Sequence, residues 1–564
     1  MKNSAVRKTL HCFCIFCRES QILLRKGGVL MPSKQPFRIY LMLSILLLGM
    51  AGVLLQLLNA AGGEEAAAVG VKQGKYHLHI PLTQGVIYDR FMRPLNQTED
   101  RWLAVVSPTE ETVEAVFPVL KDRDSFTRQL QSVSPFVCEL TEPPAQTPEL
   151  TVLPARGDRS GALTAQHLLG YRQENRGAAG LERAFSDVLT ACDTSADLTF
   201  SVDALGAVLA GDDSETDMNG TPGGGIVTTL DRDIQKITET ALQAVRPDPG
   251  AAVVLDCRTG DILASASTPV YQPEALADSL DDPQSPFLNR VLCAYNVGSV
   301  FKLVIAAAGL EHGFTADFVN DCTGSTEIYG QVFRCHRRSG HGLLDMEQAV
   351  IESCNPYFIT LSRMLSAADL HHTAELLGFG QRIVLADGIA SDSGSLQSAE
   401  MLSIDAEKAN FSFGQGMLLA TPLQICAMTA CIANRGIYTE PQLVVGVTAD
   451  GSSCPGMPDP AQHYALKPET AQQLCGMMQA VLADPEHANG APFNTTAGGK
   501  TSTAQTGHFA ADGTEYCHAW MTGFFPADDP HYAVTVLVEN GGSGNEAAAP
   551  VFRRIIEEMT RAGL

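Results

Sequence analysis

A serine and a lysine three positions apart could carry out covalent acyl transfer. Ser299 and Lys302 lie in the segment NVGSVFKLVIAAAGLE (296–311), whose composition predicts a helix. Residues at this spacing share one face of a helix. A serine hydroxyl needs a base to act as a nucleophile near neutral pH, and a lysine that burial keeps uncharged can be that base. We therefore predict that Ser299 is the nucleophile and that Lys302 activates it.

A second polar segment could serve the same reaction. IESCNPYF (351–358) supplies the hydroxyl of Ser353 and the amide of Asn355 on either side of Cys354. A hydroxyl and an amide in one loop can relay a proton and hold a substrate amide. We expect Ser353 and Asn355 to take part in the reaction, while Cys354 is interpreted as a small packed residue.

A predicted strand supplies another cation. GGKTSTAQTG (498–507) contains Lys500, and a cation at a sheet edge can bind the carboxylate of an extended peptide that pairs with the strand. Strand alternation puts Ser502 on the same face as Lys500, where its side chain either crowds the site or adds a hydrogen bond. The candidate substrate-binding residues are Thr501, Ser502 and Thr503.

The elements that must position these residues suggest one sheet between helices. Amphipathic patterns predict helices at 230–245 and 551–561, and alternating or apolar runs predict strands. The short connections between the late strands imply antiparallel pairing. The expected strands are 250–256, 261–267, 499–505, 518–525 and 531–540. We predict an α/β (α+β) fold with an antiparallel sheet flanked by helices.

The chain before this sheet is mixed in pattern. YHLHIPLTQGVIYDR (76–90) alternates like strands, and segments 108–131 and 161–191 look helical. The polar, glycine-rich stretch 212–225 indicates a hairpin tip, a loop or a linker. We therefore expect a mixed N-terminal domain over 59–225 and place the domain boundary before Ile226.

An apolar run near the start predicts a membrane anchor. Ile39 to Leu58 contains no charged residue, and roughly 20 helical residues span a bilayer core. Lys and Arg precede the run and Glu64 and Glu65 follow it, so the N-terminus is expected in the cytoplasm and residues 59–564 outside. Residues 1–38 form the cytoplasmic segment, although translation from Met31 would omit most of it.

Composition bounds the remaining possibilities. The formal net charge of -24 argues against a nucleic-acid partner, which needs a basic face. The 15 cysteines include a cluster at Cys12, Cys14 and Cys17 that matches no ordinary zinc spacing. His341 and His518 are interpreted as structural histidines. No set of His, Cys, Asp and Glu has convincing metal spacing, so we expect no metal and no cofactor.

The polar motifs occur in the order typical of serine β-lactamases and penicillin-binding proteins. With the flanking segments, the chain beyond residue 38 resembles class B penicillin-binding proteins, the D,D-transpeptidases of cell-wall synthesis, which serve cell shape, cell division or sporulation. No stretch resembles the glycosyltransferase domain of class A relatives. The segments that carry the resemblance are GVIYDR, HLLGY, GLERAF, TTLDRDIQ, GAAVVLDCRTGDILASAS, FLNRVLCAYNVGSVFK, SFGQGMLLATPLQ and HAWMTGFFP.

The resemblance implies a role for each motif residue. Ser299 would form the acyl-enzyme with a D-Ala-D-Ala stem peptide, and Ser353 would pass a proton to the leaving D-alanine. Asn355 would hold the substrate backbone, and Lys500 with Thr501 would bind its terminal carboxylate. The backbone N–H groups of Ser299 and Thr503 would form the oxyanion hole. β-Lactams would acylate the same serine, and a membrane-embedded glycan polymerase is the implied partner.

Two positions depart from the family pattern. Val297 stands where proline is usual, which costs loop stiffness, and Ser502 stands where glycine is usual. The family often has cysteines near Cys322 and Cys335, which form either a disulfide or two free buried thiols. Two other functions stay open: a β-lactamase or β-lactam sensor on the same fold, and an inactive scaffold of the wall-building complex.

Overall fold

The computed structural model describes most of the chain in two compact units, Met1–Tyr76 and His77–Leu564. The described residues are 35–62, 74–144, 150–158, 164–173, 175–203, 205–209, 215–245, 249–456 and 458–564. The expectations for Cys12, Cys14, Cys17 and the alternative start at Met31 lie outside these residues.

The first unit contains one long apolar helix, α2 (Gln35–Gly62). Its segment Arg38–Leu58 has a mean hydropathy of 2.4, and its side chains are exposed within the unit. By length and composition this segment can cross a membrane. The predicted span 39–58 lies inside it.

The second unit is built on a five-stranded sheet in which all neighbouring strands are antiparallel. Its order, β12-β11-β26-β25-β24, sets two early strands beside three late ones. The strands are β11 (Gly250–Asp256), β12 (Ile262–Thr268), β24 (Gly498–Phe509), β25 (Glu515–Phe525) and β26 (Tyr532–Val538). This confirms the predicted sheet and puts β24, which carries Lys500, at an edge.

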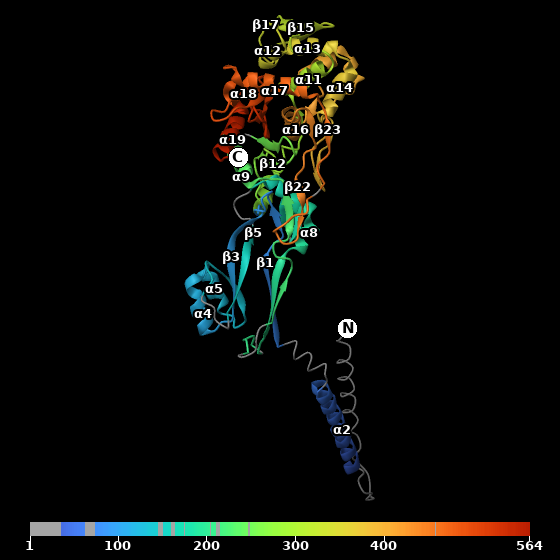
Figure 1. The fold of residues 1–564 in the computed structure, drawn as a ribbon. Helices are drawn as coiled ribbons and strands as arrows, with labels where there is room; N and C mark the ends of the chain where they lie inside the picture. The colour runs from blue at the N-terminus through green and yellow to red at the C-terminus, as the bar shows by residue number, and fades with distance from the viewer. Residues whose placement is uncertain are drawn as a thin grey trace, which may run out of the picture. The chain divides into compact units, whose positions relative to one another are not determined.

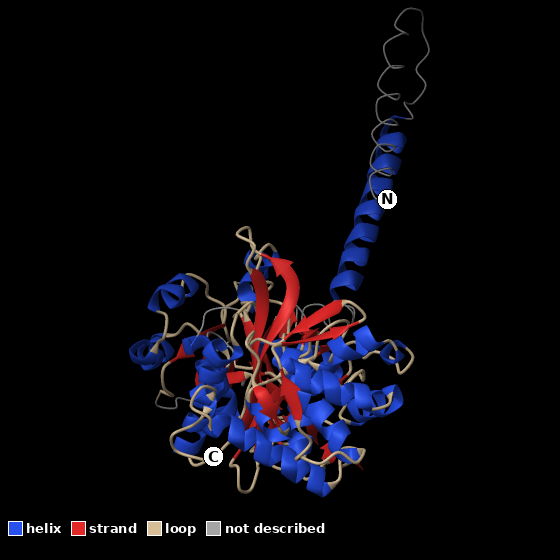
Figure 2. Ribbon diagram, turned by 90° about the horizontal axis from the view of Figure 1, so that it is seen from above, coloured by secondary structure: helices blue, strands red, loops and turns tan. Residues whose placement is uncertain are grey.

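Helices cover both faces of this sheet, as Figure 2 shows with helices in blue and strands in red. Successive residues of a strand point to opposite faces, so Val253 and Val254 of β11 join different cores. The covering helices are α9 (Arg232–Val245) and α19 (Ala549–Arg561) on the face of Val254, and α11 (Lys302–Glu311), α16 (Pro422–Ala433) and α17 (Pro468–Ala483) on the face of Val253. The predicted layers are therefore present, and Figure 1 shows α11, α16 and α17 gathered in one region.

The chain before this sheet forms smaller sheets. One contains β1, β8 and β9, and another has the order β4-β3-β5 and packs against α4 and α5. The bounds are β1 (Lys75–Thr83), β3 (Gln97–Val106), α4 (Glu110–Val116), α5 (Arg123–Gln129), β4 (Phe136–Leu140), β5 (Leu150–Asp158), β8 (Thr194–Ser201) and β9 (Glu215–Asn219). The helices predicted in 108–131 are thus present, and β9 lies inside the stretch expected to be a hairpin tip, loop or linker.

The helical pattern expected over 161–191 is interrupted. Three short helices, α6 (Gln166–Leu169), α7 (Gly180–Ala184) and α8 (Ser186–Ala191), occur there, and the hairpin of β6 (Tyr171–Gln173) and β7 (Arg176–Ala179) separates the first from the others. Gly170 has φ 75°, and a Cβ atom there would collide with the backbone of Ala179. Gly170 therefore lets β6 and the end of β7 approach closely. The helical periodicity of the sequence does not reveal this interruption.

One small sheet joins chain segments from both sides of the predicted boundary at 225/226. β10 (Gly225–Thr228) pairs in parallel with β2 (Val86–Tyr88) and antiparallel with β22 (Val444–Thr448). Backbone hydrogen bonds therefore connect the start of the unit to its later part. The boundary itself stays a prediction.

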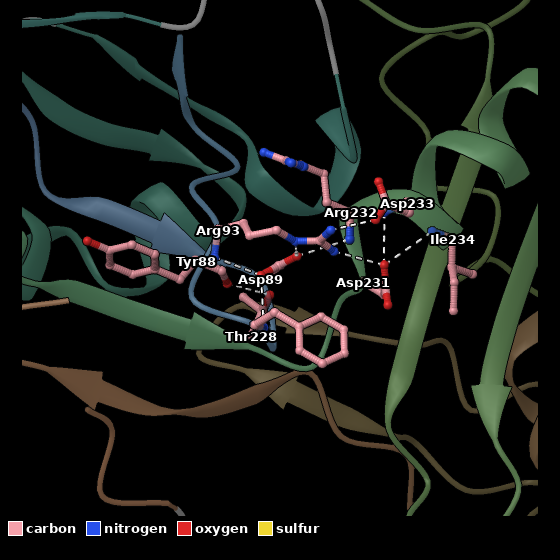
Figure 3. Close-up of polar contacts among 9 residues, drawn as sticks. Tyr88, Asp89, Arg93, Thr228, Asp231, Arg232, Asp233 and Ile234 are labelled. Atoms are coloured by element: carbon pink, nitrogen blue, oxygen red, sulfur yellow. Dashed lines mark hydrogen bonds and ion pairs between the residues drawn. The ribbon is translucent and has the colours of Figure 1, made fainter. Parts of the chain in front are cut away.

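An ion-pair network reinforces this junction (Figure 3). The guanidinium of Arg93 lies 2.6 Å from Asp89, 3.0 Å from Asp231 and 2.5 Å from Asp233. Asp89 follows β2 and is fully buried, while Asp231 also accepts N–H groups at the start of α9. One cation thus holds the turn after β2 against the first turn of α9.

Candidate active site

Ser299 lies in a short 3₁₀ turn, η3 (Gly298–Phe301), that leads directly into α11. Gly298 has φ 65°, and a Cβ atom at that position would collide with the hydroxyl of Ser502. Only glycine accepts this backbone conformation at so close an approach. The turn places Ser299 one turn from Lys302, as its spacing predicts.

The side-chain nitrogen of Lys302 contacts the predicted polar groups of the site. Its Nζ donates to Ser299 Oγ at 3.0 Å and to Asn355 Oδ1 at 2.7 Å. It also lies 2.6 Å from the carbonyl oxygen and 3.2 Å from the hydroxyl of Ser353. Ser353 has φ 50°, an uncommon conformation for serine that turns the loop toward Lys302. The structure therefore brings together four of the residues that the sequence singled out.

Burial makes Lys302 a base rather than a permanent cation. The side chain is fully buried. Burial, with the positive charge of Lys500 as a second cause, lowers the pKa of Lys302 to about 7. A substantial fraction of the amine is then uncharged near neutral pH and able to accept the Ser299 proton.

Lys500 occupies the edge strand next to this cluster. Its side chain is buried, and its Nζ donates to the carbonyl oxygen of Thr501 at 3.1 Å. Burial lowers the pKa of Lys500 to about 8, so the group remains mostly charged at neutral pH. β24 also contacts η3, which brings this cation and the nucleophile to one edge of the sheet.

Ser502 does not crowd the site but holds the backbone before the nucleophile. Its hydroxyl donates to the carbonyl oxygen of Val297 at 2.9 Å, and both side chains are buried. Of the two expectations for this departure from glycine, the hydrogen bond is the one found. The bond connects β24 to the turn that presents Ser299.

Thr501 and Thr503 alternate with Lys500 and Ser502 along β24. The Thr503 hydroxyl accepts the N–H of Gly544 at 3.3 Å. Among the described residues, neither threonine hydroxyl bonds to the Ser299 side chain. Their contribution to substrate binding, and that of the Thr503 N–H to an oxyanion hole, stay predictions.

A second network supports the segment before the nucleophile, and the sequence analysis did not anticipate it. The carboxylate of Glu539 accepts from the Arg290 guanidinium at 2.8 Å and from the Tyr295 hydroxyl at 2.7 Å. Arg290 is almost fully buried and the Glu539 side chain is 19% exposed, so water reaches only part of this ion pair. Glu539 follows β26, and no spacing in the sequence connects it to Tyr295.

The structure also brings together residues that sequence spacing kept apart. Cys322, Cys335, Cys354 and His341 place their ligand atoms within 4.8 Å of one another. The three cysteines are buried and free, so Cys322 and Cys335 are thiols rather than a disulfide. Cys354, interpreted as a packed residue, separates Ser353 from Asn355, so this cluster adjoins the Lys302 site.

Comparison with known proteins identifies the fold and its chemistry. The family described as "Penicillin binding protein transpeptidase domain" matches residues 250–557, more than half of the chain. The chain belongs to this family. The matched region of this penicillin-binding protein includes Ser299, Lys302 and the whole five-stranded sheet.

Individual relatives extend the similarity beyond that region. The chain is 30% identical to "Peptidoglycan D,D-transpeptidase PbpA" of Mycolicibacterium smegmatis, over 71% of this chain and 82% of the relative. It is 30% identical to "Stage V sporulation protein D" of Bacillus subtilis, over 70% of this chain and 62% of that protein.

Solved structures show the same fold. Penicillin-binding protein A of M. tuberculosis, solved as an imipenem acyl-enzyme complex, aligns with a TM-score of 0.60 and 25% identity, covering 72% of this chain and 93% of its own. PBP2 of Pseudomonas aeruginosa aligns with a TM-score of 0.60 and 26% identity, and the alignment covers 85% of this chain and 96% of that one. The α/β architecture expected from the sequence is therefore that of the penicillin-binding proteins.

Proposed function

We propose that this penicillin-binding protein is a serine D,D-transpeptidase that cross-links peptidoglycan through an acyl-enzyme on Ser299. The observation that carries the proposal is the 3.0 Å contact between Lys302 Nζ and Ser299 Oγ inside a buried, polar cluster. A relative named peptidoglycan D,D-transpeptidase and an acyl-enzyme structure of another relative support it.

Acylation begins when Lys302 takes the Ser299 proton as Oγ attacks the carbonyl carbon of the penultimate D-alanine. The N–H groups of Ser299 and Thr503 stabilise the resulting oxyanion. The C–N bond to the terminal D-alanine then breaks, and Ser353 passes a proton to the leaving amine. Lys302 lies within hydrogen-bonding distance of both hydroxyls, so the proton can travel between them.

Deacylation restores the serine and forms the cross-link. An amine of a neighbouring strand attacks the acyl carbon and loses a proton, and Ser299 Oγ recovers a proton as the leaving group.

Other residues bind the substrate before acylation. Asn355 holds the donor backbone, and Lys500 with Thr501 binds the carboxylate that departs with D-alanine. A β-lactam follows only the first half, because its ring opens without releasing a separate leaving group.

The β-lactamase alternative needs a group that activates water. Among the described residues, no carboxylate hydrogen-bonds to Ser299, Lys302, Ser353 or Asn355. A water molecule near the acyl carbon would therefore lack a dedicated carboxylate base. This favours transfer to an amine over hydrolysis. The inactive-scaffold alternative is disfavoured because the nucleophile and its base are already in contact.

The remaining assignments complete the proposal. Residues 59–225 form the pedestal, 226–564 form the transpeptidase domain, and 39–58 anchor the protein in the cell membrane. The basic residues before the anchor support an orientation with residues 1–38 in the cytoplasm and the catalytic domain outside it. Resemblance alone suggests a membrane-embedded glycan polymerase as a partner.

Product analysis with the full-length protein in detergent tests the reaction. A peptide ending in D-Ala-D-Ala is supplied with an excess of an amine acceptor, and both free D-alanine and the coupled peptide are quantified. We expect D-alanine release to match formation of the coupled product. Hydrolysed peptide as the main product would contradict transpeptidation, and no release of D-alanine would support the scaffold.

The rate of acylation by benzylpenicillin should rise with pH through about 7. Only the uncharged Lys302 amine can accept the serine proton, and the pKa of that lysine is lowered to about 7. Below this value the rate should fall about tenfold for each pH unit, and above it the rate should level off. Stopped-flow measurements from about pH 5.5 to about pH 9 check this; a profile that stays flat down to about pH 5.5 would rule out Lys302 as the base.

A further inference from the structure

Three buried cysteines and a histidine converge beside the active site. The sulfur atoms of Cys322, Cys335 and Cys354 and a ring nitrogen of His341 lie within 4.8 Å of one another. Each cysteine is at most 1% exposed, and so is the His341 side chain. A disulfide could join only two of the three thiols, so it would not explain why the third thiol and the imidazole lie at the same place.

The separations suit a tetrahedral metal ion. Zinc binds cysteine sulfur at about 2.3 Å and histidine nitrogen at about 2.0–2.1 Å, so tetrahedral ligands lie about 3.6–3.8 Å apart. The sulfur of Cys335 lies 3.5 Å from Nδ1 of His341. No two of the four ligand atoms lie more than 4.8 Å apart, so metal binding requires a contraction of at most about 1 Å.

The second ring nitrogen of His341 supports the same interpretation. Nε2 is buried without a hydrogen-bond partner, yet it lies 3.3 Å from a carboxylate oxygen of Glu352. A histidine that binds a metal through Nδ1 carries its proton on Nε2 and commonly donates it to a carboxylate. Small rotations on metal binding would turn this contact into that hydrogen bond.

The surrounding backbone is built to bring the ligands together. Cys322 ends β14 (Asn320–Cys322), and the N–H of His341 donates to the carbonyl oxygen of Cys322 at 3.0 Å. Gly340 has φ 80°, and a Cβ atom there would collide with that same carbonyl oxygen. The glycine therefore permits the close approach of the two ligand-bearing segments.

These segments bury little apolar surface of their own. β14 pairs with β17 (Gly342–Leu344), and β15 (Ser325–Ile328) pairs with β16 (Gln331–Arg334). Each strand has only three or four residues, and most of them are exposed or half-buried. Isolated two-stranded hairpins are at best marginally stable in water, so a structural metal ion would supply the missing stability.

We propose that Cys322, Cys335, His341 and Cys354 bind one Zn²⁺ ion. Three thiolates and one imidazole fill all four tetrahedral positions, which is typical of structural rather than catalytic zinc. The mixture of soft sulfur and nitrogen ligands favours zinc over magnesium or calcium. The ion stabilises the two small sheets and takes no part in acyl transfer.

The ion would also position the catalytic loop. Cys354 lies between Ser353 and Asn355, and the Asn355 amide donates to the carbonyl oxygen of Arg334 at 3.1 Å, next to Cys335. The middle of the Ser353–Asn355 loop and its Asn355 side are thus connected to residues at the metal. The metal site itself does not depend on the proposed reaction, but this effect on acylation does.

Metal content of the untagged, full-length protein tests the site. Protein purified in detergent without chelators is analysed by inductively coupled plasma mass spectrometry and zinc-edge X-ray absorption. We expect one zinc per chain, with about three sulfur ligands near 2.3 Å and one nitrogen ligand near 2.0 Å. Protein without stoichiometric zinc, or with a different metal in its place, would overturn the assignment.

Variants locate the ion without relying on activity. Cys335→Ser and His341→Ala are each expected to lower the zinc content at least about fivefold, because each removes one of four ligands. Cys426→Ser is the matched control, since Cys426 is equally buried but bonds to the carbonyl oxygen of Ala533 in the sheet. Zinc retained in Cys335→Ser and His341→Ala would place the metal elsewhere.

A mercurial reagent provides a test that needs no variant. Titration of the wild-type thiols with p-hydroxymercuribenzoate should release one zinc per chain to a coloured indicator. Acylation by benzylpenicillin should then slow about tenfold if the ion positions the catalytic loop, as loss of supporting contacts around a site commonly causes. Zinc release without slower acylation would reject the positioning effect and leave the metal site intact.

Discussion

Replacing Lys302 with methionine is expected to slow acylation by benzylpenicillin about 1,000-fold. Methionine fills a similar buried volume but cannot accept the Ser299 proton. The loss should persist at all pH values, because no titrating base replaces the amine. The second-order rate constant of acylation, followed with the purified full-length protein, measures the effect.

Lys408→Met is the matched control for this substitution. Lys408 is also buried, but its Nζ donates to the carbonyl oxygen of Leu365, outside the catalytic cluster. Its replacement should leave the acylation rate within about twofold of wild type, and comparison of thermal midpoints separates misfolding from lost chemistry. Acylation of Lys302→Met within tenfold of the wild-type rate would remove Lys302 from the mechanism.

Arg93→Met should destabilise the second unit by about 3–5 kcal/mol. The substitution leaves the fully buried Asp89 carboxylate without its cation, and it removes the partner of Asp231 at the start of α9. Breaking a buried ion pair from one side is costly because the remaining charge stays desolvated. Urea unfolding followed by intrinsic fluorescence measures the change in the free energy of unfolding.

An exposed ion pair gives the control for this prediction. Arg258 lies 2.7 Å from Asp529, with side chains 52% and 73% exposed. Arg258→Met should change the stability by less than about 1 kcal/mol, because water already solvates both groups. Equal losses in the two variants would mean that the network around Arg93 does not hold the junction together.

The sequence predicted the central sheet and the active-site cluster well because both rest on local signals. β11 is a mostly apolar run, and β12 follows it after a short turn. The Ser299–Lys302 spacing defines one helical turn. Lys302 also needed a buried environment, and the surrounding apolar sequence of α11 indicated it. The contact between Lys302 and Asn355 was not predicted, since the two residues lie far apart in the chain.

The features that the sequence did not predict depend on contacts between distant segments. The Glu539 carboxylate accepts a hydrogen bond from the Tyr295 hydroxyl, and nothing near either residue in the sequence signals the other. The four residues of the cysteine cluster follow one another at intervals of 13, 6 and 13 positions, and nothing along the chain marks them as one ligand set, so no metal was expected. Only the pairing of β14 with β17 reveals that Cys322 and His341 are neighbours.

Ser502 illustrates an intermediate case. Alternation along β24 correctly gave its face but not its partner. The hydroxyl could be placed only once the carbonyl oxygen of Val297 was known to lie opposite it, at 2.9 Å. Ser502 and Val297 are the two departures from the family pattern. The Ser502 hydroxyl therefore hydrogen-bonds to the segment that lacks the usual proline.

Peptide mapping of the penicillin-treated, full-length protein tests the central assignment most directly. We expect a mass increase of one benzylpenicillin per chain, located by tandem mass spectrometry on Ser299. Ser299→Ala should carry no adduct under the same conditions. An adduct on any other residue, or none on folded wild-type protein, would show that Ser299 is not the nucleophile.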